Sequence, residues 1–223
     1  MIKKIFVLFV LGSLNASLFT TYISAQKNEP FKTYTFPASS INMLESTMTN
    51  GNITVTGGAG EVLVEMLVSG NSPRIRRKWS DEEIKQYLEE NYTIEVKIDS
   101  EKLLATARLK NDGKKGKNYF SISFRIAVPR QMSTNLKTTN GSIQISNLSG
   151  SQKFQTVNGS LKVENISGKI SGSTVNGSIT VTNSKDDINL NTVNGSIAAK
   201  DCDGKIILNT VNGRVKRENA GEN

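Results

Sequence analysis

A repeat of nine residues fills residues 138–221 and constrains the fold of this chain more than any other feature. Counted from Gly141, the blocks read GSIQISNLS, GSQKFQTVN, GSLKVENIS, GKISGSTVN, GSITVTNSK, DDINLNTVN, GSIAAKDCD, GKIILNTVN and GRVKRENAG. Every block opens with glycine except the one that opens with Asp186. A fixed period of this kind is typical of solenoids, in which each unit buries its apolar side against its neighbours.

A second period of 18 residues lies on top of the first, because alternate blocks differ in kind. One kind ends in T-V-N, and the other ends in N-I-S or a similar sequence. The dipeptide Asn-Gly therefore recurs every 18 residues, at Asn140, Asn158, Asn176, Asn194 and Asn212. Blocks of the same kind are therefore 18 residues apart and can stack on each other only at this spacing. The expected structural unit thus has 18 residues.

The apolar positions inside each block have the spacing of a β-strand. Positions 3 and 5 are mostly Ile, Leu, Val or Phe, and alternate residues of a strand share a face. Position 8 is usually apolar too, which indicates an inward side chain beyond a corner, and glycine at position 1 permits the positive φ that a sharp corner needs. Asn-Gly is also a strong hairpin signal, so a meander of hairpins is the competing fold. We favour a parallel β-solenoid with two short strands in each 18-residue coil.

The predicted core consists of side chains stacked at intervals of 18 residues. These ladders are Ile143, Leu161, Ile179, Ile197 and Val215; Ile145, Val163, Val181 and Ala199; Gln152, Ile170, Ile188 and Ile206; Phe154, Gly172, Leu190 and Leu208; and, at the corner, Val157, Val175, Val193 and Val211. The column of Asn140, Asn158, Asn176, Asn194 and Asn212 would stack amide on amide. It is either a polar binding strip or, in the interpretation that we favour, a structural ladder of corner turns joined by hydrogen bonds.

The N-terminus has the pattern of a secretory signal peptide. Lys3 and Lys4 precede the apolar run Ile5–Leu11, and small residues end at Ala25. The apolar run is too short and interrupted to span a membrane comfortably. We therefore predict a signal peptide over residues 1–25, cleavage near Ala25, export, and a mature chain without a transmembrane anchor.

The mature chain is expected to have two parts, an N-terminal β-rich part (residues 26–137) and the β-solenoid repeats (residues 138–223). The repeat motif also occurs upstream, in the sequence TNGNITV around Asn50. The next block, GEVLVEMLV, places Val62, Val64 and Leu67 in expected core positions. The first coil would begin here and would be interrupted by an insertion from about residue 70 to residue 131.

The insertion holds the only strong helix signal of the mature chain. Ser80 and Glu83 form a capping-box pattern, and Trp79 precedes the cap as in a hydrophobic staple with Ile84. We predict a helix over residues 80–90, whose acidic first turn serves helix electrostatics and not acid–base catalysis. The segments YTIEVKID, LLATARLK and YFSISFRIAVP follow as strands. This region would cover the open N-terminal end of the solenoid.

Several kinds of chemistry have no support in the sequence. The chain contains no histidine, which excludes Ser-His and Cys-His nucleophile pairs and histidine metal sites. The aspartates of the repeat cluster at Asp186, Asp187, Asp201 and Asp203, which rules out a regular calcium ladder and leaves one weak candidate site at Asp201 and Asp203. The lone Cys202 cannot form an internal disulfide and is expected to pack as a small apolar residue. We expect no catalytic residue, no metal site and no cofactor.

The net charge is modest once the expected signal peptide is removed. The chain carries +8, and without Lys3 and Lys4 the charge is 8 − 2 = +6. Basic residues cluster in residues 74–78 and 114–117, without the interleaved aromatic residues that a nucleic-acid surface would have. We interpret both clusters as solvated surface and expect no nucleic-acid partner. An anionic polysaccharide or membrane surface is the alternative.

These motifs together resemble the bacterial putative-adhesin family of exported domains. The resemblance rests on the T-V-N-G-S-I repeats, the upstream T-N-G-N-I-T-V and the strand ending R-I-A-V-P before the first repeat, and it covers roughly residues 35–216. It implies a right-handed β-solenoid at the cell envelope or surface. It supplies no catalytic or ligand-binding residues.

Three functions are compatible with these features. The first is a non-enzymatic adhesin or envelope scaffold that binds a cell-surface glycan or an envelope protein through the polar faces of the rod. The second is an envelope-stress sensor that binds a protein partner through the N-terminal region. The third, a polysaccharide-acting enzyme, is suggested only by the solenoid shape, because no convergent carboxylates are present on the outward positions.

Overall fold

The structure is a computed structural model, and it describes residues 29–70, 79–110 and 120–220. The expected signal peptide and both basic clusters lie outside the described residues. Within this part, the N-terminal strands are β1 (Lys32–Phe36), β2 (Met43–Asn50), β3 (Ile53–Gly57), β4 (Val62–Gly70), β5 (Tyr92–Asp99), β6 (Lys102–Leu109) and β7 (Phe120–Val128). A short 3-10 helix, η1 (Ala38–Ser40), and one α-helix, α2 (Asp81–Asn91), accompany them.

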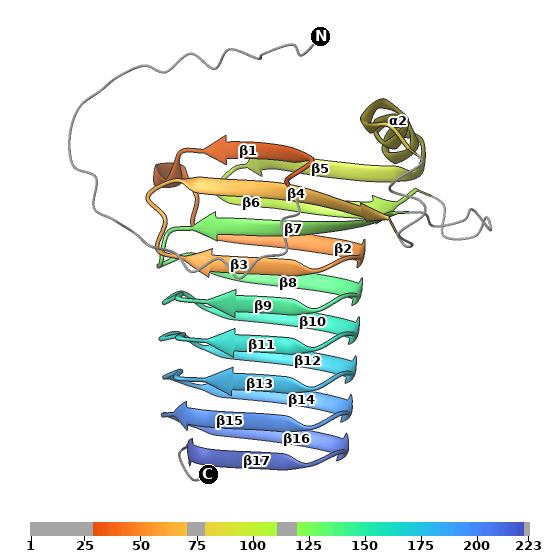
Figure 1. Ribbon diagram of the computed structural model, residues 1–223. Coiled ribbons are helices and arrows are strands. Elements are labelled where there is room, and N and C mark those ends of the chain that lie inside the picture. Colours follow the sequence, from red (N-terminus) through yellow and green to blue (C-terminus); the bar gives the residue numbers. More distant parts are fainter. Residues whose placement is uncertain (1–28, 71–78, 111–119, 221–223) are drawn as a thin grey trace.

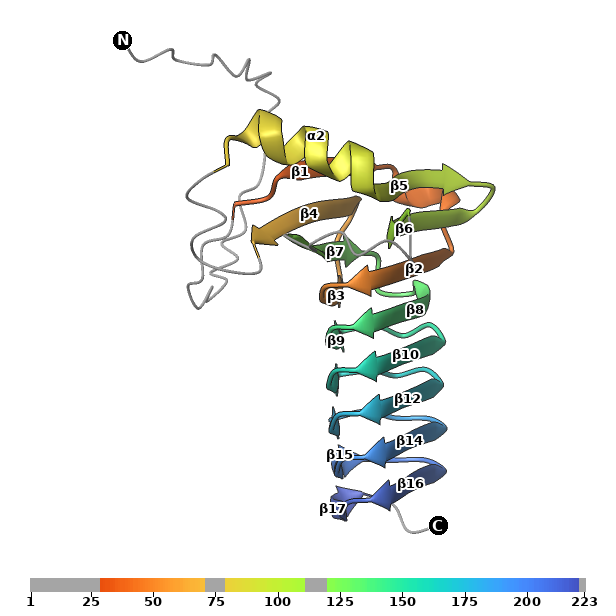
Figure 2. The ribbon, with the colours of Figure 1, turned by 90° about the vertical axis from the view of Figure 1, so that its right-hand side faces the viewer.

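Ten further strands make up the repeat region. They are β8 (Ser133–Asn140), β9 (Ile143–Ser146), β10 (Gln152–Asn158), β11 (Leu161–Glu164), β12 (Ile170–Asn176), β13 (Ile179–Thr182), β14 (Ile188–Asn194), β15 (Ile197–Cys202), β16 (Ile206–Asn212) and β17 (Val215–Ala220). Successive strands lie alternately in two sheets that face each other, and together they form a rod (Figures 1 and 2). The expectation of a nearly all-β chain with long parallel sheets and one short helix is confirmed.

Both sheets are open, and their strand orders show how the repeat stacks. The nine-stranded sheet, called sheet A below, has the order β1-β4-β7-β3-β9-β11-β13-β15-β17. The eight-stranded sheet, sheet B, has the order β16-β14-β12-β10-β8-β2-β6-β5. Each repeat strand pairs in parallel with the strand 18 residues later, so that Ile143 pairs with Leu161 and Phe154 with Gly172. Parallel pairing at this spacing excludes the hairpin meander.

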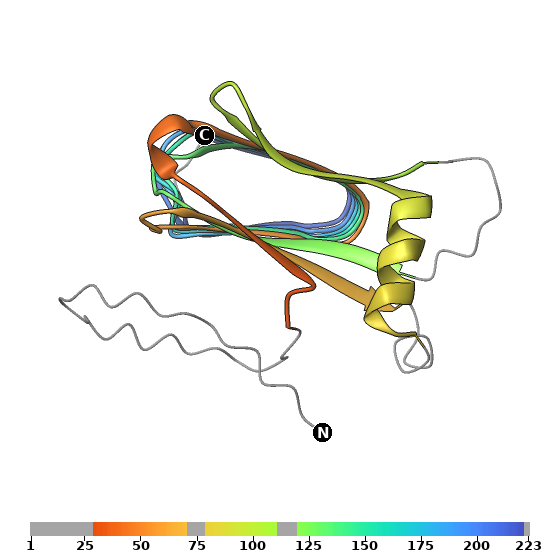
Figure 3. The ribbon, with the colours of Figure 1, turned by 90° about the horizontal axis from the view of Figure 1, so that it is seen from above.

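The core lies between the two sheets, which enclose an elongated interior when seen along the rod (Figure 3). Four of the five predicted ladders are buried there, apart from Val215, which is 43% exposed on the terminal strand β17. Two positions in these ladders, Gly172 and Gln152, lack an apolar side chain, and each has a local explanation. A Cβ on Gly172 would lie 2.1 Å from Cε2 of Phe154, so the missing side chain is replaced by the neighbouring ring. Gln152 accepts a hydrogen bond from Thr134 Oγ1 at 2.6 Å and donates to the Gly150 carbonyl at 2.7 Å, which satisfies a buried amide.

The fifth ladder was predicted on the wrong side of the sheet. Val157, Val175 and Val193 are 39–41% exposed, and Val211 is 74% exposed. The strand continues its alternation through these positions, so the preceding threonines point inward in their place. Their hydroxyls donate to glycine carbonyls of the neighbouring coil: Thr156 to Gly141, Thr174 to Gly159, Thr192 to Gly177 and Thr210 to Gly195, at 2.7–2.9 Å. Position 8 is buried only in the other kind of block, at Leu148, Ile166, Ser184 and Cys202.

The glycines that follow the asparagine column are needed for space and not for positive φ. None of Gly141, Gly159 and Gly177 has a positive φ. A Cβ on each would lie only 1.9–2.1 Å from a carbonyl oxygen of the glycine stacked before it. The expected reason for these glycines was therefore wrong, because close approach between coils, and not a left-handed corner, excludes a side chain here.

The upstream motif lies directly on the first repeat. Asn50 of β2 pairs with Asn140 of β8, and Ile53 of β3 pairs with Ile143 of β9, an offset of 90 residues. The insertion between them extends both sheets, because β6 pairs in parallel with β2 and β7 pairs in parallel with β3, and the chain then returns in register at β8. This placement joins two segments far apart in the sequence into one pair of sheets.

The block after the upstream motif does not continue the stack. Strand β4 pairs antiparallel with β1 and β7, whereas the repeat strands are parallel. Its alternation buries Met66 and Val68 and leaves Leu67 half-buried, so the prediction of Leu67 in the core was wrong. The N-terminal elements β1, β4, β5, β6, β7 and α2 thus form the upper end of the rod (Figure 1).

Candidate functional site

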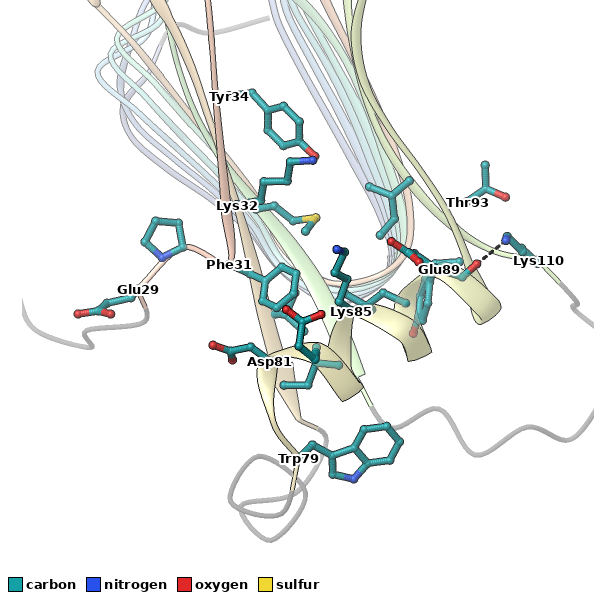
Figure 4. A pocket seen from close by; sticks show the side chains of 18 residues that line it. Glu29, Phe31, Lys32, Tyr34, Trp79, Asp81, Lys85, Glu89, Thr93 and Lys110 are labelled. Carbon is teal, nitrogen blue, oxygen red and sulfur yellow. Dashed lines mark hydrogen bonds between the residues drawn. The ribbon is translucent and has the colours of Figure 1, made fainter. Parts of the chain in front are cut away.

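A cavity of about 930 Å³ opens at the upper end of the rod, between β1, β5 and α2 (Figure 4). Apolar side chains form part of its wall: Phe31, Met66, Val68, Ile84, Leu88 and Ile94. Charged side chains of both signs surround the opening, among them Lys32 on β1 and Asp81, Lys85 and Glu89 on α2. We refer to this space as the α2 cavity.

Helix α2 is fixed at the cavity by its N-terminal cap and its apolar stripe. The Glu83 N–H donates to Ser80 Oγ at 3.3 Å, and the Ser80 N–H donates to the Glu83 carboxylate at 2.7 Å, which confirms the predicted capping box. The hydrogen bond from the Ser80 backbone holds the pKa of Glu83 below its ordinary value. Ile84 and Leu88 form the apolar stripe and are buried on the inner side of the helix.

Aromatic rings join α2 to sheet A. Trp79 packs edge to face against Tyr87 and Phe120, with ring centroids 5.5 and 5.4 Å apart. The hydroxyl of Tyr92, at the start of β5, donates to the Phe120 carbonyl at 2.7 Å. Burial raises the pKa of Tyr92 to about 12, and the neighbouring Tyr87 adds to the rise. Trp79 therefore helps to anchor the helix through an aromatic cluster that the staple pattern did not indicate.

The charged groups at the opening make contacts with neighbouring residues. Lys32 Nζ lies 4.8 Å from the centroid of the Tyr34 ring, a cation–π contact. Lys110 Nζ donates to the Glu89 carbonyl. Lys85 extends from α2 into the space that separates the helix from β1 (Figure 4). The cavity combines apolar walls with charged side chains of both signs, which suits an amphipathic ligand or a segment of a partner protein.

The asparagines singled out in the sequence form a continuous column on the outside of the rod. Each side-chain amide donates to the amide oxygen of the previous asparagine at 2.8 Å, from Asn212 through Asn194, Asn176, Asn158 and Asn140 to Asn50. Every internal member therefore uses one donor and one acceptor along the stack. These amides are exposed at their outer side, where a ligand could reach them.

A second polar column was not predicted from the sequence. Asn147, Asn165, Asn183, Asp201 and Asn219 all have a left-handed backbone, with φ between 47° and 60°. Asn165 donates to Asn147 at 3.1 Å, Asn183 to Asn165 at 2.6 Å, and Asn219 to Asp201 at 2.9 Å. Asparagine and aspartate tolerate this conformation better than other residues with a side chain. The signal was present at block position 7, which holds Asn or Asp in each block of this kind.

The carboxylates of the candidate cation site, Asp201 and Asp203, already accept hydrogen bonds from neighbouring residues. Asp201 Oδ1 accepts from Asn219, and Asp203 Oδ1 accepts from the Gly204 N–H at 2.8 Å. Within residues 29–70, 79–110 and 120–220, no three His, Cys, Asp or Glu side chains lie close enough to hold a metal ion together. Cys202 is buried, and burial raises the pKa of its thiol.

Two shallow grooves mark the outer face of sheet B. One, of about 360 Å³, crosses the rows that contain Lys153, Lys169, Asp187 and Lys205, where Lys169 and Asp187 form an ion pair at 3.4 Å. The other, of about 400 Å³, runs along the exposed Val175, Val193 and Val211. The exposed valines are thus part of a shallow outer groove and not of the core.

Comparisons with known proteins give no family assignment. No protein-family model matches the sequence, and no curated protein matches it. Among solved structures, the chain is similar to a putative cell adhesion protein from Clostridium sporogenes, with 11% identity and a TM-score of 0.40 over 86% of this chain and 100% of that one. It is also similar to a putative adhesin from Bacteroides fragilis, with 15% identity and a TM-score of 0.40 over 83% of this chain and 96% of that one.

A third similar structure carries a different name. It is a putative lipid binding protein from Parabacteroides distasonis, with 10% identity and a TM-score of 0.25 over 83% of this chain and 96% of that one. At these identities and TM-scores the similarities carry no information about a ligand or an activity. The described part of the chain contains no helix long and apolar enough to cross a membrane.

Proposed function

We propose that this chain is a non-enzymatic exported protein that acts as an adhesin or binding scaffold of the cell envelope. In this proposal, residues 1–25 are a signal peptide and residues 26–137 are an N-terminal β-rich part. Residues 138–223 are a right-handed parallel β-solenoid with two strands in each 18-residue coil. The mature protein has no membrane anchor and no cofactor, and its ligand is a cell-surface glycan or an envelope protein.

The observation that carries the proposal is the regular polar lattice on the outside of the rod. On sheet B, the outward rows include Lys153, Ser171 and Asn189 at one level along the strands, and Gln155, Ser173 and Asn191 at the next. Neighbouring strands place these side chains about 4.8 Å apart. A ligand with its own repeat, such as a polysaccharide, could make many weak contacts at once, which raises the effective affinity. In our proposal, the asparagine column from Asn140 to Asn212 holds the stack in register beside this lattice, at the ends of the sheet B strands.

Binding to envelope material tests this function. The purified protein is labelled and mixed with isolated cell envelopes and with a panel of polysaccharides, and we expect saturable binding that unlabelled protein displaces. Two matched variants then locate the face: Ser171→Glu with Asn189→Glu on sheet B, and Gln144→Glu with Thr180→Glu on sheet A. All four side chains are exposed, so both variants should fold. Absence of saturable binding by the unaltered protein to every preparation would contradict the proposal.

A second candidate function is recognition of a protein partner at the α2 cavity, as in an envelope-stress sensor. The cavity favours it, because it is a larger concavity than either groove on the rod. Lys85→Glu changes the charge inside the cavity without removing a buried group. Loss of a co-purified partner in this variant, with retention in Lys162→Glu on the rod, would favour this function over binding along the rod.

A further inference from the structure

The edge strands β17, at the lower end of the rod, and β5, at the upper end, differ in their inward side chains. At the lower end, Arg217 of β17 occupies the row that holds Val181 and Ala199 in the strands before it. A charged side chain at an inward position blunts an edge strand against pairing with another chain. At the upper end, β5 is the edge of sheet B, and the inward row of β5 holds Tyr92, Ile94, Val96 and Ile98 without a charge. The free edge of β5 therefore lacks the protection that the free edge of β17 has.

The free edge of β5 presents unused backbone groups from residues with apolar side chains. The Lys110 N–H donates to the Asn91 carbonyl at 2.9 Å, which marks this opposite pair as a hydrogen-bonded pair of the β5–β6 ladder. Along an antiparallel strand, successive residues direct their backbone N–H and C=O groups to opposite sides. The backbone groups of Thr93, Glu95 and Lys97 therefore bond to β6. The N–H and C=O groups of Ile94, Val96 and Ile98 then face the free edge. Ile94, Val96 and Ile98 are also only half-buried, since no further strand of the described chain lies beside them.

We propose that β5 pairs with β5 of a second copy of this chain and that the protein is a dimer joined at its upper end. The antiparallel pairing is centred on Val96, which lies opposite Val96 of the partner subunit in a hydrogen-bonded pair. Ile94 then lies opposite Ile98 of the partner subunit. Sheet B becomes one continuous sheet through both copies, and the two rods point away from each other.

Charge complementarity selects both the occupant and the register. In the pairing centred on Val96, Glu95 lies opposite Lys97 of the partner subunit, and symmetry repeats this ion pair. Both positions are of the non-hydrogen-bonded kind, in which opposite side chains approach more closely. A shift of two residues in one direction places Glu95 opposite its own copy, and a shift in the other direction does the same for Lys97. Like charges directly opposite each other destabilise a strand pair, so the central register is the favourable one of these three.

The surrounding elements leave room for this pairing. Helix α2 lies across the end of the sheets where β5 begins, and the rest of the β5 ribbon is clear of it (Figures 1 and 3). In an antiparallel dimer the second α2 lies at the opposite end of the strand pair. The two helices therefore flank the new strand pair. A two-fold, self-complementary contact of this kind is the commonest way in which identical chains associate.

Charge exchange on β5 tests the proposal. The molar mass of the purified chain is measured by sedimentation equilibrium over a wide range of concentrations, and we expect a reversible dimer. Glu95→Lys and Lys97→Glu each place two pairs of like charges across the interface, so each should weaken the dimer by roughly tenfold or more. The double variant Glu95→Lys/Lys97→Glu restores opposite charges and should restore the dimer. Both side chains are about half exposed and form an ion pair with each other at 3.0 Å, so folding is not at risk.

Two further variants test whether the dimer depends on the free edge of β5. Val96→Pro removes an N–H that faces the free edge, so it should abolish the dimer and leave the β5–β6 ladder intact. Glu164→Lys is the matched control, because Glu164 forms a similar pair with Lys162 on β11, a strand paired on both sides. It should leave the dimer unchanged. A chain that is monomeric at every concentration, a dimer that survives Lys97→Glu or Val96→Pro, or a folded double variant that stays monomeric would each overturn the proposal.

Discussion

In the T-V-N segments the threonine is buried and the valine is exposed, the reverse of what is usual for these residues. Thr174 is 3% exposed, and its neighbour Val175 is 40% exposed. The cost of burying a hydroxyl is offset because it donates to the Gly159 carbonyl at 2.9 Å. The sequence pattern could not reveal this, because an apolar residue next to a polar one normally indicates that the apolar residue faces the core. The deciding factor is a carbonyl of the adjacent coil, which only the three-dimensional stack places there.

A pair of single substitutions tests this assignment. Thr174→Val keeps the shape of the side chain but removes the donor, so it should lower the free energy of unfolding by about 1–2 kcal/mol. Val175→Thr should change it by less than about 0.5 kcal/mol, because the side chain already faces water. Even Val175→Asp should change the free energy of unfolding only slightly, because the new charge would lie at an exposed position. Urea denaturation of the variants measures the differences, and equal losses at positions 174 and 175 would contradict the assignment.

The buried phenol of Tyr92 gives the fold a dependence on alkaline pH. Its pKa is raised by burial from 10.0 to about 12, so the unfolded chain loses this proton first as the pH rises. The contribution of Tyr92 is therefore complete below pH 10 and is lost as the pH rises through 12. We expect the unaltered protein to lose stability relative to Tyr92→Phe across this range, as measured by urea denaturation at successive pH values. A difference between the two that stays constant from pH 9 to pH 12 would contradict the burial of the phenol.

At the scale of single elements, the sequence predicted well those elements whose signals lie in one short segment. It predicted the pairing partners of the strands poorly. Helix α2 was placed within one residue at each end, because its capping box and apolar stripe are contained in one short segment. The inward faces of β5 and β7 also follow from the simple alternation of apolar residues. Strand β4 reads as a continuation of the repeat, yet it pairs antiparallel with β7. That choice depends on β7, more than 50 residues away along the chain, and no nearby residue indicates it.

The cap of α2 can be tested separately from the rod. Ser80→Ala removes the acceptor for the Glu83 N–H, and loss of an N-terminal cap costs about 1 kcal/mol. Because the capping box lies at one end of one helix, we expect faster hydrogen exchange of the α2 amides and unchanged exchange in β10, β12 and β14. Ser171→Ala, an exposed change on the rod, is the control and should alter neither region. Uniformly faster exchange throughout the rod would show that α2 is coupled to the whole stack.

At the scale of the whole molecule, the repeat determines the rod but not the candidate site. The 18-residue period predicts which side chains stack, because each coil sees nearly the same neighbours. The α2 cavity has no such periodic signal. It is assembled from Lys32 on β1, Met66 on β4, Lys85 on α2 and Ile94 on β5, which meet only after the insertion folds over the upper end. A site built from four separate segments cannot be inferred from spacing.

Deletion of repeat units tests whether the stack behaves as a one-dimensional array. Deleting residues 177–194 joins Asn176 to Gly195, which preserves the sequence T-V-N-G-S-I and the alternation between the sheets. The shortened protein should fold, because Gly172 then stacks on Leu208 as it now stacks on Leu190, and it should lose the stability of one interface between coils. Deleting only residues 177–185 joins β12 directly to β14, so two strands of sheet B follow each other with no strand of sheet A between them. This second variant should lose protection from hydrogen exchange from β14 to β17. Equal stability of the two deletions would mean that the nine-residue block, and not the pair of blocks, is the unit that stacks.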